Sequence, residues 1–476
     1  MRILHLSDHY APVLGGIETH VAALARQQAL GGDRVTVLTS TPATADGRHC
    51  DDAGPVTVRR VGSVRAGLAT DVTSYDLVHV HVSVVAPFSA PVAAVLARRG
   101  VPTVVTVHSL WGGMGPVPGV AAGLVGLRSA PVSWTAVSLV AAEQLRAQLP
   151  PGTAVEVLPN AVDVPARRST PERPPGEAVR LVSTMRLARR KRPMPLLRMF
   201  DGVRRAVDRP VRLTVVGDGP LRAGFEQRVR RAGLQDLVTV TGRVEPLEVH
   251  RALAESDVYV APAVLESFGL AALEARSVGL PVVGHAASGM ADFIDHGVDG
   301  LLCADDRAMV GALVDLVASP ALCRRIAEHN RVVSPAMTWE HTLRCHEAAY
   351  ARAVALTRHS RSLAAISWNE VVSLTHTGSV DMTSLTIFIL ITLPLVPYAP
   401  SIARGRPQRQ GRWSALTGPK VAPSGRGRDG VRPTSACSAS AVRSATCSCA
   451  KPMTAFSSTT PESRSPARGW RNFWGW

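Results

Sequence analysis

The sequence is poor in aromatic residues and in cysteine. Phe, Trp and Tyr make up 4% of the chain, whereas hydrophobic residues as a whole make up 46%, which supports well-filled cores. Cys437, Cys447 and Cys449 lie near the C-terminus, and the other four cysteines are scattered without the spacing of a disulfide framework or a metal site. A reducing, cytoplasmic setting fits this pattern best.

Signals for export and for metal binding are also missing. The N-terminal residues MRILHLSDHY enter a predicted strand directly, without a basic region and a long apolar run, so we expect no secretory signal. The sequence has no Asp-x-Asp in a suitable loop and no His/Cys cluster at ligand spacing. We therefore expect neither a metal nor another cofactor.

The net charge of +16 is unevenly distributed. Residues 401–476 contain 13 Lys or Arg against two acids, Asp429 and Glu462, an excess of 11 that leaves about +5 for the rest. The body of the protein is therefore only mildly basic, and we expect no nucleic-acid partner.

Strand and helix patterns alternate through most of the chain. Short β-branched runs such as RILHLS, RVTVLTS and PTVVTVHS are separated by amphipathic helical patterns, which indicates parallel sheets covered on both faces. A segment rich in Pro and charge interrupts this alternation, which then restarts. We predict two Rossmann-like domains at 1–163 and 179–336, a linker at 164–178, a helix at 337–356, an apolar segment at 357–400, and a basic low-complexity tail at 401–476.

Two carboxylates flank a predicted helix start in the second domain. Glu266 precedes Gly269, and Glu274 lies on the helical pattern LAALEARSVG. Eight residues of helix separate the two carboxylates by at most roughly 12 Å. The backbone amides at the helix start favour an anion, so this arrangement suits a phosphate flanked by two sugars.

Glycines and cations occupy comparable loops. Gly15 and Gly16 follow the first predicted strand and precede a helix, where backbone amides can approach a diphosphate or a sugar. Arg186 and Lys191 follow the first strand of the second domain, while a solvated helix start accounts for Arg189 and Arg190. His108 ends the strand PTVVTVHS, and His79 and His81 face one side of DLVHVHV, with at least one of them merely lining a cleft.

These motifs resemble those of the family 4 retaining glycosyltransferases, whose two-domain fold is called GT-B. The resemblance covers residues 1 to about 356 and includes the E-x7-E signature at Glu266 and Glu274. It departs from the family at Arg192, where Gly is usual. It implies an α/β fold with two Rossmann-like domains facing each other across a cleft, and a terminal helix that crosses back to the first domain.

The resemblance also implies roles for individual residues. Glu266 and His108 would contact the donor hexose, and Glu274 the ribose. Arg186 and Lys191 would neutralise the leaving diphosphate. The remaining donor contacts implied by the family are those of Gly15, Gly16, Ser267, Phe268, Gly269, Leu270 and Arg243.

The activity implied is metal-independent transfer of a hexose, with retention, from a nucleoside diphosphate sugar to a hydroxyl of a glycan, a glycolipid or a small molecule. Trp111 to Leu127, which is Gly-rich and apolar, would meet a lipid acceptor or form a core helix. The apolar run at 384–398 is short for a spanning helix and suggests at most a weak anchor. Peripheral contact with the inner face of the cell membrane is therefore a further expectation.

Two other functions remain open from the sequence. Sugar-nucleotide epimerases share the two-domain shape, although no set of acid and base carboxylates for epimerisation stands out here. The apolar segment and the basic tail are compatible with a non-catalytic, membrane-associated protein.

Overall fold

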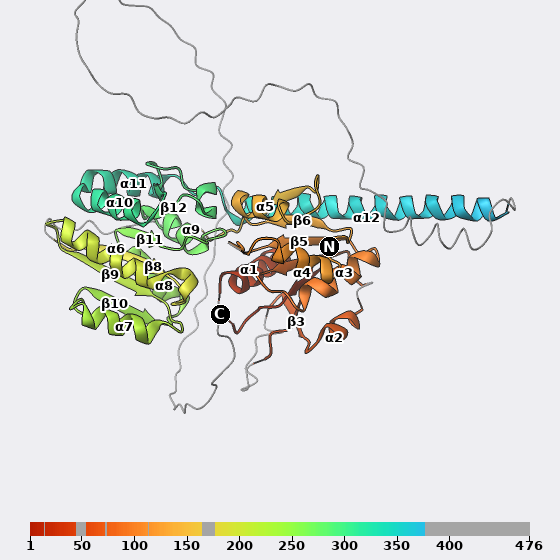
Figure 1. Cartoon of the computed structure of the whole chain (residues 1–476), viewed down its shortest axis with the longest axis horizontal. Helices are drawn as coiled ribbons and strands as arrows, with labels where there is room; N and C mark the ends of the chain where they lie inside the picture. The colour runs from red at the N-terminus through yellow and green to blue at the C-terminus, as the bar shows by residue number, and fades with distance from the viewer. Residues whose placement is uncertain (14, 44–53, 72–73, 113, 164–176, 377–476) are drawn as a thin grey trace, which may run out of the picture. The chain divides into compact units, whose positions relative to one another are not determined.

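A computed structural model describes residues 1–13, 15–43, 54–71, 74–112, 114–163 and 177–376. Their strands form two separate sheets in which every strand pair is parallel, and helices flank each sheet (Figure 1). The predicted α/β fold with two Rossmann-like domains is therefore confirmed. The predicted linker lies almost entirely outside the described residues.

The first sheet has seven strands in the order β3-β2-β1-β4-β5-β6-β7. Its central strands are buried along almost their whole length, as expected for strands covered on both faces. The strands are β1 (Arg2–Ser7), β2 (Arg34–Thr39), β3 (Val56–Arg60), β4 (Leu77–Val82), β5 (Thr103–Val107), β6 (Ser133–Ala136) and β7 (Val155–Val157). The helices are α1 (Gly16–Leu30), α2 (Val64–Leu68), α3 (Ser89–Arg98), α4 (Val117–Leu124) and α5 (Leu139–Arg146).

The second sheet has six strands in the order β10-β9-β8-β11-β12-β13. The strands are β8 (Val179–Thr184), β9 (Val211–Val216), β10 (Val238–Gly242), β11 (Val258–Ala261), β12 (Val282–His285) and β13 (Gly300–Cys303). The α-helices are α6 (Pro193–Ala206), α7 (Arg222–Arg231), α8 (Pro246–Ala254), α9 (Leu270–Ser277), α10 (Asp306–Ala318) and α11 (Pro320–Val332). Two short 3-10 helices are η1 (Arg189–Lys191) and η2 (Gly289–Asp292).

The helix α12 (Trp339–His376) returns to the first domain. Figure 1 shows it beside β5 and β6, and Ala349, Tyr350 and Ala353 pack with Ile3 and other core residues of the first sheet. The helix extends to His376, beyond the predicted end at residue 356. The apolar run at 384–398 lies outside the described residues, and within them no helix is both long and apolar enough to span a membrane.

Strand order determines where the loops meet. In the first sheet the order reverses between β1 and β4, and in the second between β8 and β11. Open parallel sheets bind ligands at the carboxyl ends of the strands beside such a reversal. Arg186 and Lys191 follow β8, and Glu266 follows β11, so the topology brings the predicted cations and carboxylate to one point.

Candidate functional site

An ion pair joins the loops that follow β8 and β11. The Lys191 Nζ atom lies 2.6 Å from the Glu266 Oε2 atom, and the Glu266 side chain is 18% exposed. The two residues are 75 positions apart in the chain. The structure thus brings together two of the predicted site residues, with opposite charges in contact at the reversal of the second sheet.

Gly269 shapes the start of α9. It has φ 96°, a left-handed conformation, and a Cβ atom placed there would lie 2.6 Å from the Met290 Cγ atom. No side chain caps this end of the helix. Gly289 packs against the same loop: its N–H donates to the Glu266 carbonyl oxygen at 2.9 Å, and a Cβ atom would lie 2.1 Å from the Ser267 carbonyl oxygen. Two glycines therefore hold the loop close to its neighbours.

Glu274 lies on α9, about one helical turn beyond Gly269. Burial raises the pKa of its carboxyl from 4.5 to about 7. The side chain is therefore held partly protonated near neutral pH, and a bound group that donates hydrogen bonds to it would favour the ionised form.

Arg192 departs from the family pattern, and its conformation explains why Gly is usual there. It has φ 60°, and it is the only non-glycine residue with positive φ in the described part of the chain. Its guanidinium makes two hydrogen bonds of 2.8 Å to the Asp306 carboxylate and one of 2.9 Å to the Pro262 carbonyl oxygen. These bonds offset the cost of the left-handed backbone and fix the loop that ends in Lys191.

Hydrogen bonds connect the two domains around the Glu266 loop. The Ser267 hydroxyl donates to the His108 carbonyl oxygen at 2.6 Å. The Ser267 carbonyl oxygen accepts from the Ser138 hydroxyl at 2.5 Å, and the Leu139 N–H donates to the Asp292 carboxylate at 2.8 Å. His108 and the Glu266 loop, which the sequence placed on facing domains, are therefore in direct contact through Ser267.

Arg190 corrects a prediction. The sequence favoured a solvated helix start for Arg189 and Arg190, but the Arg190 guanidinium donates to the Leu110 carbonyl oxygen of the other domain. The Arg189 side chain, in contrast, has no hydrogen bond or ion pair among the described residues. Arg190 therefore helps to hold the first domain beside the cationic loop.

The histidines of the first domain form a buried cluster. His108 is 5% exposed, His79 is fully buried and His81 is 2% exposed, so neither His79 nor His81 lines a cleft as predicted. Burial lowers the pKa of His108 to about 3 and those of His5 and His346 to about 4. All three imidazoles are neutral at physiological pH.

A possible set of metal ligands emerges only from the fold. Within the described residues, His5, His79 and His81 bring ring nitrogens within 4.8 Å of one another. The sequence spacing gave no sign of this group, because His5 lies on β1 and the others on β4. The parallel register of these strands pairs His5 directly with His79.

The other predicted residues make fewer contacts. Arg186 and Arg243 are exposed and have no ion pair among the described residues. Gly16 has open space where a Cβ atom would lie, whereas the Glu18 carboxylate folds over Gly15. That carboxylate disfavours a phosphate at the start of α1 and leaves a place better suited to a hydroxyl donor.

Two hollows lie apart from Lys191 and Glu266. One of about 200 Å³ is lined by Trp111, Met114, Gln144, Gln148 and neighbouring residues, in the region predicted to meet an acceptor. The other, of about 310 Å³, lies between α6 and α7 and contains none of the predicted site residues.

Sequence reasoning missed several residues that shape the site. His5, Gln28 and Tyr350 join the histidine cluster, and Asp306 anchors Arg192. A histidine in the first strand and another two in β4 are the only local signal for the cluster. The contact of Tyr350 has no local signal, since 322 residues separate it from Gln28.

Two family models match the chain in succession. The model described as Glycosyltransferase Family 4 matches residues 14–165. The model described as Glycosyl transferases group 1 matches residues 168–333. Together they cover every strand of the two sheets except β1, and they include Gly15, His108, Lys191 and the two glutamates.

Individual proteins support the same relationship. The chain is 27% identical to D-inositol 3-phosphate glycosyltransferase of Rhodococcus erythropolis over 400 residues, covering 72% of this chain and 89% of that protein. It resembles the structure of Anabaena HepE in complex with UDP and glucose, with 18% identity, a TM-score of 0.56, and coverage of 77% and 100%. It also resembles sucrose-phosphate synthase of Thermosynechococcus elongatus, with 22% identity, a TM-score of 0.57, and coverage of 77% and 99%. The likeness to the two structures shows that the fold is GT-B.

Proposed function

Because the chain belongs to family 4 of the glycosyltransferases, we propose that it transfers a hexose from a nucleoside diphosphate sugar to an acceptor hydroxyl, with retention and without a metal ion. The observation that carries this proposal is the ion pair of Lys191 and Glu266 at the strand reversal of the second sheet. A UDP complex of a protein with the same fold supports a nucleoside diphosphate as the donor.

Lys191 acts on the leaving group. Negative charge develops on the diphosphate as the bond to the hexose breaks, and a fixed ammonium stabilises that charge in the transition state. The diphosphate takes over the hydrogen bonds of the Lys191 ammonium, which releases the Glu266 carboxylate to accept bonds from the hexose. The exposed Arg186, on the same loop, supplies a second cation.

The start of α9 holds the diphosphate. The uncapped helix end carries partial positive charge, and the backbone amides of Phe268, Gly269 and Leu270 donate to the phosphate oxygens. The Ser267 hydroxyl keeps this loop attached to the His108 strand end. The departing phosphate then accepts the proton of the acceptor hydroxyl, so the new bond forms on the face from which the leaving group departs.

Glu274 binds the ribose. Two ribose hydroxyls donate to its carboxylate, and this interaction favours the ionised form that burial opposes in the free protein. Arg243 lies beside the base. His108 and the loop of Gly15 and Gly16 contact the hexose, since Glu18 makes that loop a poor place for phosphate.

The acceptor binds on the first domain. The hollow beside Trp111 adjoins α4, which exposes Val117, Val120 and Leu124, the last 85% exposed. An apolar helix surface next to an acceptor hollow supports a glycolipid acceptor and peripheral contact with a membrane. The protein would then work in the cytoplasm at the inner face of the cell membrane.

Purified protein incubated with UDP-, GDP- and ADP-hexoses tests the proposal. We expect one donor to raise the melting temperature and to be consumed when acceptor is added, with the anomeric configuration retained in the product. Lys191→Ala and Glu266→Gln should each lower kcat by about 10²–10³-fold. Arg189→Ala, which removes a neighbouring cation without a partner among the described residues, is the matched control and should keep full activity.

Each rival function gives a different result. An epimer formed from the donor in the absence of acceptor would identify an isomerase. Loss of donor turnover when residues after 360 are deleted would favour a role that depends on the C-terminal segment. Near-normal transfer by both Lys191→Ala and Glu266→Gln would refute the assignment of the site.

A further inference from the structure

A chain of hydrogen-bonded side chains starts from one backbone carbonyl in the first sheet. The Thr135 hydroxyl donates to the Val105 carbonyl oxygen at 3.1 Å, and the Thr135 and Thr106 hydroxyl oxygens lie 2.6 Å apart. A carbonyl only accepts and each hydroxyl has one hydrogen, so Thr106 donates to Thr135. The Thr106 oxygen must then accept from His79 Nε2, which lies 2.7 Å away.

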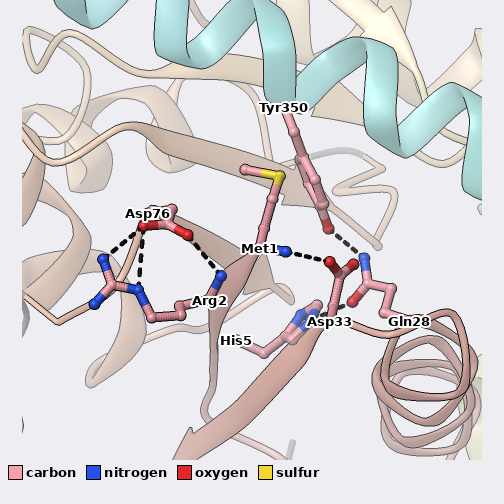
Figure 2. Close-up of polar contacts among 7 residues, drawn as sticks. All are labelled: Met1, Arg2, His5, Gln28, Asp33, Asp76 and Tyr350. Atoms are coloured by element: carbon pink, nitrogen blue, oxygen red, sulfur yellow. Dashed lines mark hydrogen bonds and ion pairs between the residues drawn. The ribbon is translucent and has the colours of Figure 1, made fainter.

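The same logic continues through Tyr350 and Gln28. Burial lowers the pKa of His79 well below 6.5, so the ring is neutral and its Nδ1 atom accepts the Tyr350 hydroxyl hydrogen at 2.8 Å. Tyr350 in turn accepts from Gln28 Nε2 at 2.8 Å. The amide oxygen of Gln28 therefore faces His5 Nε2 at 2.7 Å and can only accept from it (Figure 2). His5 carries its proton on Nε2.

Two further steps reach His108. His5 Nδ1 accepts from His81 Nε2 at 2.9 Å, and His81 Nδ1 accepts from His108 Nε2 at 3.0 Å. The pKa of His81 also lies well below 6.5 because of burial, so each ring has a single N–H. The Val105 carbonyl thus sets which atom donates in every bond. At the far end of the series, His108 carries its proton on Nε2, and its Nδ1 atom keeps an unshared lone pair.

His108 Nδ1 is accessible. It has no hydrogen-bond partner among the described residues. The Nδ1 atom of His20 also lacks a partner and is fully shielded from solvent, whereas the Nδ1 atom of His108 is not. The residual exposure of His108 therefore includes this nitrogen.

We propose that these eight hydrogen bonds, the His108 relay, hold His108 in the Nε2–H tautomer and present its Nδ1 lone pair to a hydroxyl of the donor hexose. Gln28, Tyr350 and His79 are positioning residues in this relay, because they act on the donor only through His108. The contact with the hexose rests on the proposed function, whereas the tautomer does not. Reversing the relay would set the Thr135 oxygen lone pair against the Val105 carbonyl oxygen, which buried polar groups avoid.

A metal ion would use the same nitrogens in another way. An ion held by His5, His79 and His81 would take at least one lone pair that now accepts from Tyr350 or His81. The relay and the metal site therefore exclude each other, and the metal content of the purified protein distinguishes them.

Long-range ¹H–¹⁵N correlation spectra of protein labelled on the histidine rings test the relay directly. We expect His5, His79, His81 and His108 all to be Nε2–H tautomers, with no stoichiometric metal. Tyr350→Phe removes the hydroxyl that accepts from the Gln28 amide. The amide can then rotate so that its oxygen and nitrogen exchange places, and His108 should populate both tautomers. Gln28→Met should also let His108 populate both tautomers, because it removes the amide that links Tyr350 to His5. Thr342→Val is the matched control, because its buried hydroxyl on the same helix has no partner among the described residues.

Activity adds a second readout. Tyr350→Phe should lower kcat/KM for the sugar donor about twofold, because about half of the molecules then carry the Nδ1–H tautomer, which cannot accept the hexose hydroxyl hydrogen, while affinity for the nucleoside diphosphate stays unchanged. An Nδ1–H tautomer at His108, an unchanged His108 spectrum in Tyr350→Phe, or one bound metal ion per chain would overturn the relay. An intact Nε2–H spectrum in a protein that turns over no sugar donor would overturn only the hexose contact and the proposed function.

Discussion

Acidification should destabilise this protein strongly, because six of the seven buried histidines in the described residues are neutral rings that no carboxylate stabilises in the charged form. The pKa values of His5, His20, His79, His81, His108 and His346 are all lowered, first of all by burial, and no carboxylate is among the groups that affect them. In the unfolded chain these groups bind protons below pH 6.5, whereas in the folded chain they do not. The free energy of unfolding therefore falls as pH drops through 6.5, and continues to fall until the folded pKa values of about 3 to 4 are reached.

The size of the effect follows from the same linkage. Between pH 7.5 and 5.5 each neutral histidine costs about 1.4 kcal/mol, so six cost about 8 kcal/mol together. Glu274 acts in the opposite direction, because its folded pKa of about 7 lies above the unfolded value of 4.5. Its protonation returns about 2 kcal/mol over this range, leaving a net loss of about 6 kcal/mol. That loss is comparable to the whole stability of a typical domain.

Urea unfolding curves at pH values from 7.5 to 5.5, followed by circular dichroism, measure this loss. We expect His346→Leu to reduce the net loss by about 1.4 kcal/mol, roughly a quarter of it, since it removes one of the six rings. A net loss in the free energy of unfolding below about 1.4 kcal/mol across this range would mean that no more than two of the rings stay neutral, and would refute the argument.

Three further predictions concern the loop, the ribose site and the surface. Gly289→Ala should lower both stability and kcat, because its Cβ atom would lie 2.1 Å from the Ser267 carbonyl oxygen. Thermal unfolding and donor turnover measure this, and Gly311→Ala, in open space on α10, is the control. Donor affinity should weaken up to tenfold per pH unit below about pH 7, since the diol favours ionised Glu274, and calorimetry on Glu274→Gln should show no such dependence. Leu124→Ser should weaken co-sedimentation with anionic vesicles without changing turnover of a water-soluble acceptor.

The alternation of strands and helices could be predicted because it depends on local patterns. A parallel strand covered on both faces must be apolar along its whole length, and DLVHVHV and PTVVTVHS carry that signal in a few residues. The meeting of Lys191 and Glu266 could also be anticipated, because both follow strands whose carboxyl ends share one edge of a sheet. The length of α12 was underestimated, because its pattern weakens after residue 356 although the helix continues to His376.

The sequence by itself determined the two α/β domains and the carboxylate, cations and glycines of the predicted donor site, since these follow from periodicity and from motifs within a few residues. Only the tertiary structure decided the contacts of Arg190 and Arg192 and the assembly of the histidine relay. Those contacts depend on strand register, such as His5 opposite His79 and Thr106 opposite Thr135, and on a helix that returns from the far end of the chain. No local pattern encodes a register, because it is set by how whole elements pack against one another.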